Sequence, residues 1–202
     1  MKPIVYVVDD DLSVREALSS LIRSVGLRVQ TFESAKAFLA FERPDTAACL
    51  VLDVRMPGLN GLELQRELAL GAAALPIIFV TGHGDIPMTV RAMKAGAVDF
   101  LPKPFREQDL LDAIAHSLEI DAAARRQRSE RAEIQARYDT LTSREREVIS
   151  RVVSGMRNKE TALALGISEV TVKVHRHNIM EKMGARSLPS LASMVERLQK
   201  PV

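Results

Sequence analysis

The chain has 202 residues, 47% of them hydrophobic, which is enough to bury one large core or the cores of two small domains. Since it has no apolar run of about 18 residues and no basic-then-apolar start, we expect neither a membrane span nor a secretory signal. The single cysteine, Cys49, excludes an internal disulfide and suits a reducing, cytoplasmic compartment, and its apolar surroundings favour an inert core thiol.

The net charge of +2 is unevenly distributed along the chain. Residues 1–118 carry 12 Lys and Arg against 15 Asp and Glu, a net charge of −3, whereas residues 119–202 carry 16 against 11, a net charge of +5. This asymmetry favours two domains with different partners, of which nucleic acid is a candidate for the second. The charge is weak evidence by itself, because many domains that bind no nucleic acid carry as much.

The first half alternates short apolar runs with helical patterns. Strands are predicted at 4–8, 29–32, 49–52, 77–80 and 98–101, and each precedes a helical pattern, at 14–25, 37–41, 61–68, 86–95 and from about 107. Strands this apolar are buried on both faces, which requires helices on both sides of a parallel sheet. The pattern therefore predicts a doubly wound α/β domain with five parallel strands over residues 1–118.

The following segment, DAAARRQRSERAEIQARYD, is rich in Ala, Arg and Glu, lacks Gly and Pro, and has only Ile134 and Tyr138 as large apolar residues. We expect residues 119–139 to form a solvated helical linker. A coiled-coil contact is an open alternative, for which the heptads are too poor to argue. Residues 140–202 then show several short helical patterns and no strand-like runs, which predicts a small all-α domain.

Acidic residues stand directly after two predicted strands. Asp9, Asp10 and Asp11 follow the first strand, and Asp53 follows the third. The carboxyl ends of parallel strands meet at one edge, so at least three of these carboxylates converge if the two strands are neighbours. Their repulsion would raise their pKa values and destabilise the fold unless a divalent cation or a lysine compensates for it.

Two further polar residues fall at the same edge. Thr81 follows the fourth strand and Lys103 follows the fifth. Acids, a hydroxyl, an ammonium and a Mg²⁺ ion suit phosphoryl transfer onto a carboxylate, with Asp53 attacking in line while the metal and Lys103 neutralise the phosphate oxygens. The simpler alternative, capping aspartates and a surface lysine, suits each residue alone but does not explain why all of them gather at one edge.

Four stretches of this half, VVDDD, VLDVRMPGLNG, VTGHGD and DFLPKPF, resemble the flavodoxin-like receiver domain of two-component response regulators. The resemblance implies that Asp53 accepts a phosphoryl group from a sensor histidine kinase. It also implies that Asp10, Asp53 and the backbone carbonyl of Arg55 bind Mg²⁺, with Asp9 in support. Lys103 would pair with the phosphoryl group, and the bond from Lys103 to Pro104 would be cis.

The same resemblance implies a switch. Thr81 would move to hydrogen-bond the phosphoryl group, and Phe100 would turn inward into the space that Thr81 vacates. Because Phe100 lacks the tyrosine hydroxyl of many relatives, an outward state held by such a hydroxyl is not accessible. Relatives dimerise through the fourth helix and fifth strand, which here is the region 85–101. This region carries Met88, Val90, Arg91, Lys94 and Asp99.

The second half begins with a capping box, in which Thr142 stands three residues before Glu145. The buried stripe of that helix is Val148, Ile149, Val152 and Val153. The next segment, NKETALALGISEVTVKVHRHNIMEKM, predicts a helix, a tight turn at Gly166 and a second helix, with Asn158 and Ser168 as the N-caps. A helix-turn-helix and a plain helical hairpin both fit this pattern.

Projecting the second helix at about 100° per residue separates two faces. Val172, His175, Ile179 and Met183 form the inward stripe, which favours a packed, hydrogen-bonded role for His175. The outward face presents Val170, Lys173, Val174 and His177. Lys173 would reach guanine acceptors, and Val174 a thymine methyl group. Residues on the flanks suit phosphate contacts: Thr171, Arg176, Asn178 and Lys159.

The stretches LTSREREV, NKETALALGIS and TVKVHRHNIMEKM resemble the DNA-binding domain of LuxR/NarL-type regulators, over about residues 140–200. Together with TGHGD and MKAGAVDF, they resemble the FixJ subgroup of transcriptional regulators. In that family the position of His177 varies and tunes the sequence preference. The resemblance implies promoter DNA as a partner and RNA polymerase as a candidate partner.

We hypothesise that phosphorylation of Asp53 biases a two-state receiver and promotes dimerisation, placing two recognition helices about one DNA turn apart. Release of a DNA-binding domain covered by the unphosphorylated receiver is an equally open route.

Two other classes of function are considered: an aspartyl phosphatase, and a scaffold that works without phosphorylation. The phosphatase pattern fits Asp9 and Asp11, but Leu12 and Ser13 follow and no cap insertion is evident, so we expect no enzyme beyond self-phosphorylation and self-dephosphorylation.

Overall fold

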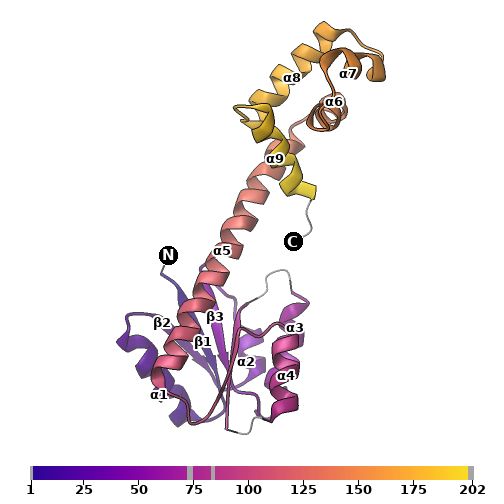
Figure 1. Cartoon of the computed structure of the whole chain (residues 1–202). Coiled ribbons are helices and arrows are strands. Elements are labelled where there is room, and N and C mark those ends of the chain that lie inside the picture. The colour runs from indigo at the N-terminus through magenta and orange to yellow at the C-terminus, as the bar shows by residue number, and fades with distance from the viewer. Residues whose placement is uncertain (1, 72–74, 83–84, 200–202) are drawn as a thin grey trace. The chain divides into compact units, whose positions relative to one another are not determined.

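The computed structural model describes residues 2–71, 75–82 and 85–199 (Figure 1). The chain divides into two compact units, Met1–Arg125 and Arg126–Val202. Among the described residues, none of the helices combines the length and apolarity that crossing a bilayer demands.

The first unit contains a five-stranded parallel sheet in the order β2-β1-β3-β4-β5. Its strands are β1 (Ile4–Val8), β2 (Arg28–Phe32), β3 (Ala48–Leu52), β4 (Ile77–Thr81) and β5 (Asp99–Pro102). The helices are α1 (Leu12–Ser24), α2 (Ala35–Leu39), α3 (Gly61–Ala69), α4 (Ile86–Lys94) and α5 (Glu107–Asp139). The predicted doubly wound α/β fold is confirmed, because β1 and β3 are neighbours and helices cover both faces of the sheet (Figure 1).

The sheet has a hydrophobic core on each face, and successive residues of the central strands point alternately into one core and the other. Tyr6 and Val8 of β1 belong to the core that also contains Phe38 of α2 and Leu64 of α3. Val5 and Val7 belong to the opposite core, with residues of α1 and α5, among them Leu18, Ile22, Leu110 and Ile114. The prediction of burial on both faces is confirmed for β1, β3 and β4 and is wrong for β2 and β5, which lie at the edges and are partly exposed.

The predicted linker is helical, but it is not a separate element. It continues the last helix of the first unit as α5, and the division between the units falls within this helix. The prediction that the linker is solvated is wrong at two positions. Asp121 is 2% exposed against the first unit's sheet, and Ile134 is 6% exposed in the core of the second unit.

The second unit packs four further helices around one core: α6 (Ser143–Val153), α7 (Asn158–Leu165), α8 (Glu169–Met183) and α9 (Leu188–Gln199). The described residues of this unit form helices and turns without strands, as predicted. Its core contains Val148, Ile149 and Val152 of α6 and Val172, Ile179 and Met183 of α8.

Local capping sets the bounds of these helices. The capping box of Thr142 and Glu145 is present, and the Ser168 hydroxyl accepts a hydrogen bond from the Thr171 backbone N–H at 3.1 Å, as predicted. Gly166 ends α7 with a left-handed φ of 64°, which glycine adopts without the steric cost of a side chain. The predicted N-cap of α7 is wrong by one residue: Arg157 holds that position, and Asn158 is the first helical residue.

Candidate functional site

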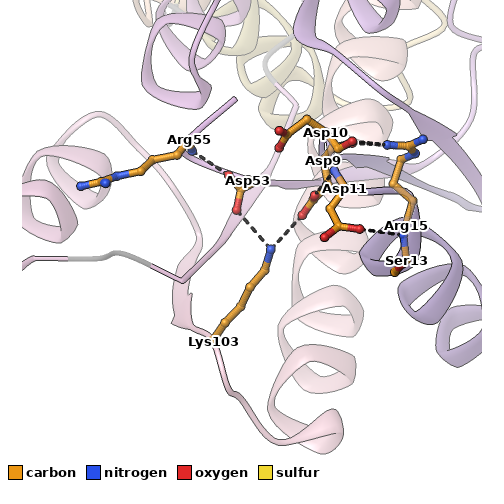
Figure 2. Close-up of polar contacts among 8 residues, drawn as sticks. All are labelled: Asp9, Asp10, Asp11, Ser13, Arg15, Asp53, Arg55 and Lys103. Carbon is orange, nitrogen blue, oxygen red and sulfur yellow. Dashed lines mark hydrogen bonds and ion pairs between the residues drawn. The ribbon is translucent and has the colours of Figure 1, made fainter. Parts of the chain in front are cut away.

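The acidic cluster lies where neighbouring strands end. In the parallel register of β1 and β3, Val8 pairs with Leu52, so the next residues, Asp9 and Asp53, lie side by side. Asp9 is 3% exposed and Asp53 is 8% exposed. The Nζ of Lys103 donates to Asp9 Oδ2 at 2.8 Å and to Asp53 Oδ1 at 3.2 Å (Figure 2). The strand order thus brings together three residues that are far apart in sequence.

The three consecutive aspartates have different environments, which limits their mutual repulsion. Asp9 faces Lys103 and also accepts a hydrogen bond from the Asp11 backbone N–H at 2.9 Å. Asp11 is the N-cap of α1, with its Oδ1 accepting from the Ser13 backbone N–H at 2.8 Å. Asp10 is exposed. The simpler alternative of a capping aspartate is therefore right for Asp11, whereas Asp9 is held by Lys103.

Arg15 was missed by the sequence reasoning. Its Nη1 donates to the backbone carbonyls of Asp9 at 2.8 Å and Asp10 at 2.9 Å (Figure 2). This guanidinium holds the turn between β1 and α1, and so it fixes the direction in which the aspartates leave the strand. No sequence signal marks this contact, since an arginine six residues after an acid is common on a helix surface.

Gly61 was also missed, although it belongs to the quoted motif VLDVRMPGLNG. A Cβ atom at this position would lie 2.4 Å from the Asp53 carbonyl oxygen. The Gly61 backbone N–H donates to the Val54 carbonyl at 3.0 Å. The first turn of α3 can therefore approach the end of β3 this closely only because residue 61 has no side chain.

Burial and charge shape the acidity of the site. Burial raises the pKa of Asp53 above its ordinary value, although the Lys103 charge and hydrogen bonds from Lys103 and the Arg55 backbone act in the opposite direction. Burial also lowers the pKa of Lys103, but its hydrogen bond to Asp9 and the charges of Asp9 and Asp53 outweigh burial and raise it. The raised pKa of Lys103 keeps its side chain positively charged at neutral pH. The raised pKa of Asp53 makes its carboxylate more basic, which favours its use as a nucleophile.

The oxygen atoms at this edge fit a magnesium ion. Within the described parts of the chain, no three His, Cys, Asp or Glu side chains are grouped as metal ligands. Mg²⁺ commonly uses one or two protein carboxylates and keeps several waters, so a larger group is not required. Asp10 lines an open groove of about 650 Å³ together with Arg55, and Asp53 Oδ2 accepts from the Arg55 backbone N–H at 2.7 Å. Asp10, Asp53 and the Arg55 carbonyl would hold the ion.

The two residues of the expected switch lie on adjacent strands. Thr81 ends β4 and is 1% exposed, and its backbone carbonyl accepts a hydrogen bond from the Lys103 backbone N–H at 2.8 Å. Phe100 of β5 is half-buried, and its ring centroid lies 6.1 Å from that of Phe79. The peptide bond from Lys103 to Pro104 is cis, as the resemblance implies. His83 and Gly84 of the motif VTGHGD lie outside the described residues.

In the second unit, α8 presents the two faces that the sequence predicts. Val172, Ile179 and Met183 are at most 1% exposed, whereas Val170 is 69% and Val174 53% exposed. Lys173 and His177 are exposed beside Val174. His175 is half-buried as expected, and the described residues offer its buried Nδ1 no hydrogen-bond partner, so the hydrogen-bonded part of the prediction stays a prediction.

The predicted phosphate contacts differ in how free they are to reach a ligand. Lys159 is exposed at the start of α7, and Asn178 is half-buried. The Thr171 and Ser168 hydroxyls share a hydrogen bond of 2.8 Å. Arg176 is half-buried, and its Nη1 donates to Asn158 Oδ1 at 2.9 Å, so this side chain also joins α8 to the start of α7.

Comparison with known proteins agrees with this division of the chain. Residues 5–115 match the family described as "Response regulator receiver domain", and residues 139–195 match "Bacterial regulatory proteins, luxR family". The chain is similar to the response regulator protein TmoT of Ectopseudomonas mendocina, with 53% identity over 97% of this chain and 89% of that protein.

Two more relatives extend the comparison. The chain is 46% identical to the transcriptional regulatory protein FixJ of Rhizobium meliloti, over 94% of this chain and 93% of that one. Among solved structures, that of the response regulator StyR is similar with a TM-score of 0.87 and 54% identity, covering 98% of this chain and all of that one.

Proposed function

This chain belongs to the response regulators that join a receiver domain to a LuxR-type DNA-binding domain, and on that premise we propose that phosphorylation of Asp53 controls its binding to promoter DNA. The observation that carries the proposal is the position of Asp53, buried at the end of β3 with Lys103 Nζ 3.2 Å from one of its carboxylate oxygens. The relatives are named response regulators and transcriptional regulators, which agrees with this role.

In the proposed reaction, a carboxylate oxygen of Asp53 attacks the phosphorus atom of a phosphohistidine on a sensor histidine kinase. The bond from phosphorus to the imidazole nitrogen breaks, its electron pair leaves on that nitrogen, and an acyl phosphate forms on Asp53. Lys103 orients Asp53 and stays close enough to pair with a phosphoryl oxygen. When bound through Asp10, Asp53 and the Arg55 carbonyl, Mg²⁺ supplies further neutralisation of charge.

The phosphorylated receiver then presents a different face to partners. Thr81 moves so that its hydroxyl donates a hydrogen bond to the phosphoryl group, and Phe100 turns into the space that Thr81 leaves. The region 85–101 forms the homodimer contact, and its exposed apolar side chains support this assignment: Ile86, Val90 and Met93 are 81%, 44% and 42% exposed. Large apolar side chains on a surface favour association with a partner.

In the second unit, α8 acts as the recognition helix. Lys173, Val174 and His177 would face the base edges of a major groove, while Lys159, Thr171, Arg176 and Asn178 would contact phosphates. A dimer of receivers would place two such helices on a two-fold promoter site. A protein with these partners works in the cytoplasm, with RNA polymerase as a candidate contact at the promoter.

The chemistry proposed for the receiver is limited to its own phosphorylation and dephosphorylation. A phosphatase of the Asp-x-Asp type would need Asp9 as nucleophile and Asp11 as acid. The N-cap role of Asp11 in α1, whose Oδ1 accepts from the Ser13 backbone N–H, argues against its use as that acid.

The experiment that tests the acceptor is labelling with radioactive acetyl phosphate in the presence of Mg²⁺. The wild type should incorporate acid-stable but base-labile label, as an acyl phosphate does, and Asp53→Asn should incorporate none. The matched control is Asp45→Asn, whose carboxylate is fully accessible on the surface. Undiminished labelling of Asp53→Asn would refute the assignment of Asp53.

A further inference from the structure

A buried carboxylate lies outside both residue ranges that match known families. Asp121 is in α5, after residue 115 and before residue 139, and it is 2% exposed. Its Oδ2 accepts hydrogen bonds from the Ala48 backbone N–H at 2.8 Å and from Arg125 Nε at 2.7 Å. Burial of an ionised carboxylate is costly unless it is paired and hydrogen-bonded, and these contacts meet both requirements.

This carboxylate joins α5 to the strand that carries the phosphoacceptor. Ala48 is the first residue of β3, and Asp53 directly follows the last. Arg125 also pairs with Asp45, in the segment that leads into β3. Two points of the helix are therefore attached to one end of the strand whose other end is modified.

The segment 119–125 has little else to hold it to the receiver. Its one large apolar residue, Ile120, is 40% exposed, and Ala122, Ala123 and Ala124 are only partly buried. Burial of so little apolar surface contributes only weakly to the attachment of this part of α5. The polar contacts of Asp121 and Arg125 must therefore provide most of the attachment.

The contacts that Asp45 and Asp121 make differ in how much they stabilise the attachment. The Asp45 side chain is 98% exposed, so its ion pair with Arg125 is screened by water and contributes little. A cavity of about 350 Å³, whose lining includes Ala48, Asp45 and Arg125, opens beside the cluster on this outer side. Asp121 lies on the inner side, where its hydrogen bonds are worth more.

We propose that Asp121 and Arg125 latch the segment 119–125 of α5 onto the receiver sheet, and that control of DNA binding by phosphorylation requires this latch. The second claim rests on the proposed function. Since α5 is the covalent connection to the second unit, a change in the receiver can act along the chain only if the intervening helix is held to the receiver. Asp121 and Arg125 act here as positioning residues and not in the phosphoryl transfer.

The first arm of the test measures the latch itself by amide hydrogen exchange of the full-length protein. Asp121→Ala should speed exchange of the amides of residues 119–125 by about tenfold or more, while those of residues 111–115 stay protected. Asp121→Asn and Arg125→Gln should have the same effect to a smaller degree, and they keep the test informative if Asp121→Ala folds poorly. Glu119→Gln, at an exposed neighbouring carboxylate, is the matched control. Equal protection in the three latch variants and Glu119→Gln would overturn the latch.

The second arm measures DNA binding with and without acetyl phosphate. The latch variants should be labelled on Asp53 to within about twofold of the wild type, but the gain in DNA affinity on phosphorylation should fall by about fivefold or more. Faster exchange together with an unchanged gain would overturn the role in control. If the wild type and Glu119→Gln showed no gain, the proposed function would fail, whereas the exchange result would still decide the latch.

Discussion

The Nζ atom of Lys103, just after β5, lies 3.2 Å from Oδ1 of Asp53, just after β3. The same ammonium lies 2.8 Å from Oδ2 of Asp9, so one cation compensates two buried carboxylates. Without it, two like charges would face each other with little access to water, which is costly. Both the stability and the charge of the site therefore depend on Lys103.

Replacing Lys103 with Ala should lower the free energy of unfolding by about 1–3 kcal/mol at neutral pH, because Asp9 and Asp53 lose their partner. Removal of this charge should also raise the pKa of Asp53 further above its ordinary value. The loss should shrink as the pH is lowered, since protonation of the carboxylates removes their repulsion. Urea unfolding at several pH values measures both effects. Lys94→Ala, at an exposed lysine of α4, is the control, and equal stability of the two variants would contradict the account.

Replacing Gly61 with Ala should destabilise the receiver by about 1–3 kcal/mol, because the new Cβ would lie 2.4 Å from the Asp53 carbonyl oxygen and the backbone must shift. The comparison is Gly82→Ala, where an added Cβ meets no atom within 4 Å. Thermal unfolding of both variants should show a lower Tm for Gly61→Ala alone. Similar Tm values would mean that the close approach of α3 to β3 is relaxed at little cost.

In the second unit, Lys182 Nζ lies 2.7 Å from Glu145 Oε2, and the Glu145 side chain is 3% exposed. Burial acts to raise the pKa of Glu145, but hydrogen bonds from Lys182 and Thr142 and the Lys182 charge outweigh it and lower the pKa. A carboxyl whose pKa is lower in the folded state stabilises the fold above its unfolded pKa, and this contribution is lost as the pH falls through the folded value.

Glu145→Gln should therefore reduce the free energy of unfolding by about 1–3 kcal/mol at neutral pH, and the difference from the wild type should disappear in acid. Urea unfolding between neutral and acidic pH is the measurement. Glu147→Gln, at a half-exposed carboxylate of the same helix, is the control. A difference for Glu145→Gln that stays constant across the pH range would show that the ion pair is not its cause.

The features that sequence predicts well are those that follow from repeating patterns. Asp9, Asp53 and Lys103 could be placed at one edge because the carboxyl ends of parallel strands meet there, whatever the side-chain details. Likewise, the exposed face of α8 follows from its helical period, and Ser168 and Thr142 follow from local capping rules.

The features that sequence missed depend on contacts between distant segments. The hydrogen bond from the Ala48 backbone N–H to Asp121 joins residues 73 positions apart, and nothing in the sequence around Asp121 marks it as different from the acids nearby. Arg157, and not Asn158, is the N-cap of α7, and the Asn158 side chain instead accepts a hydrogen bond from Arg176 of the next helix. Tertiary contacts here override a local preference.

The proposed DNA contacts differ in what they should do. Lys173→Ala should weaken operator binding by about 1–3 kcal/mol and relax the base preference, because its side chain is assigned to base edges. Lys159→Ala should weaken binding to all sequences alike and reduce the salt dependence by about one counterion. Binding to operator and random duplexes at several salt concentrations separates the two. Equal loss of preference in both variants would contradict the assignment of Lys173.

The most direct test of the account uses a DNA site selected for binding from a random pool of duplexes. The affinity of the full-length protein for this site is measured before and after treatment with acetyl phosphate and Mg²⁺. The wild type should bind more tightly after treatment, and Asp53→Asn should bind with the same low affinity in both states. An equal gain in Asp53→Asn, or no gain in a wild type that carries the label, would contradict the claim that phosphorylation of Asp53 controls DNA binding.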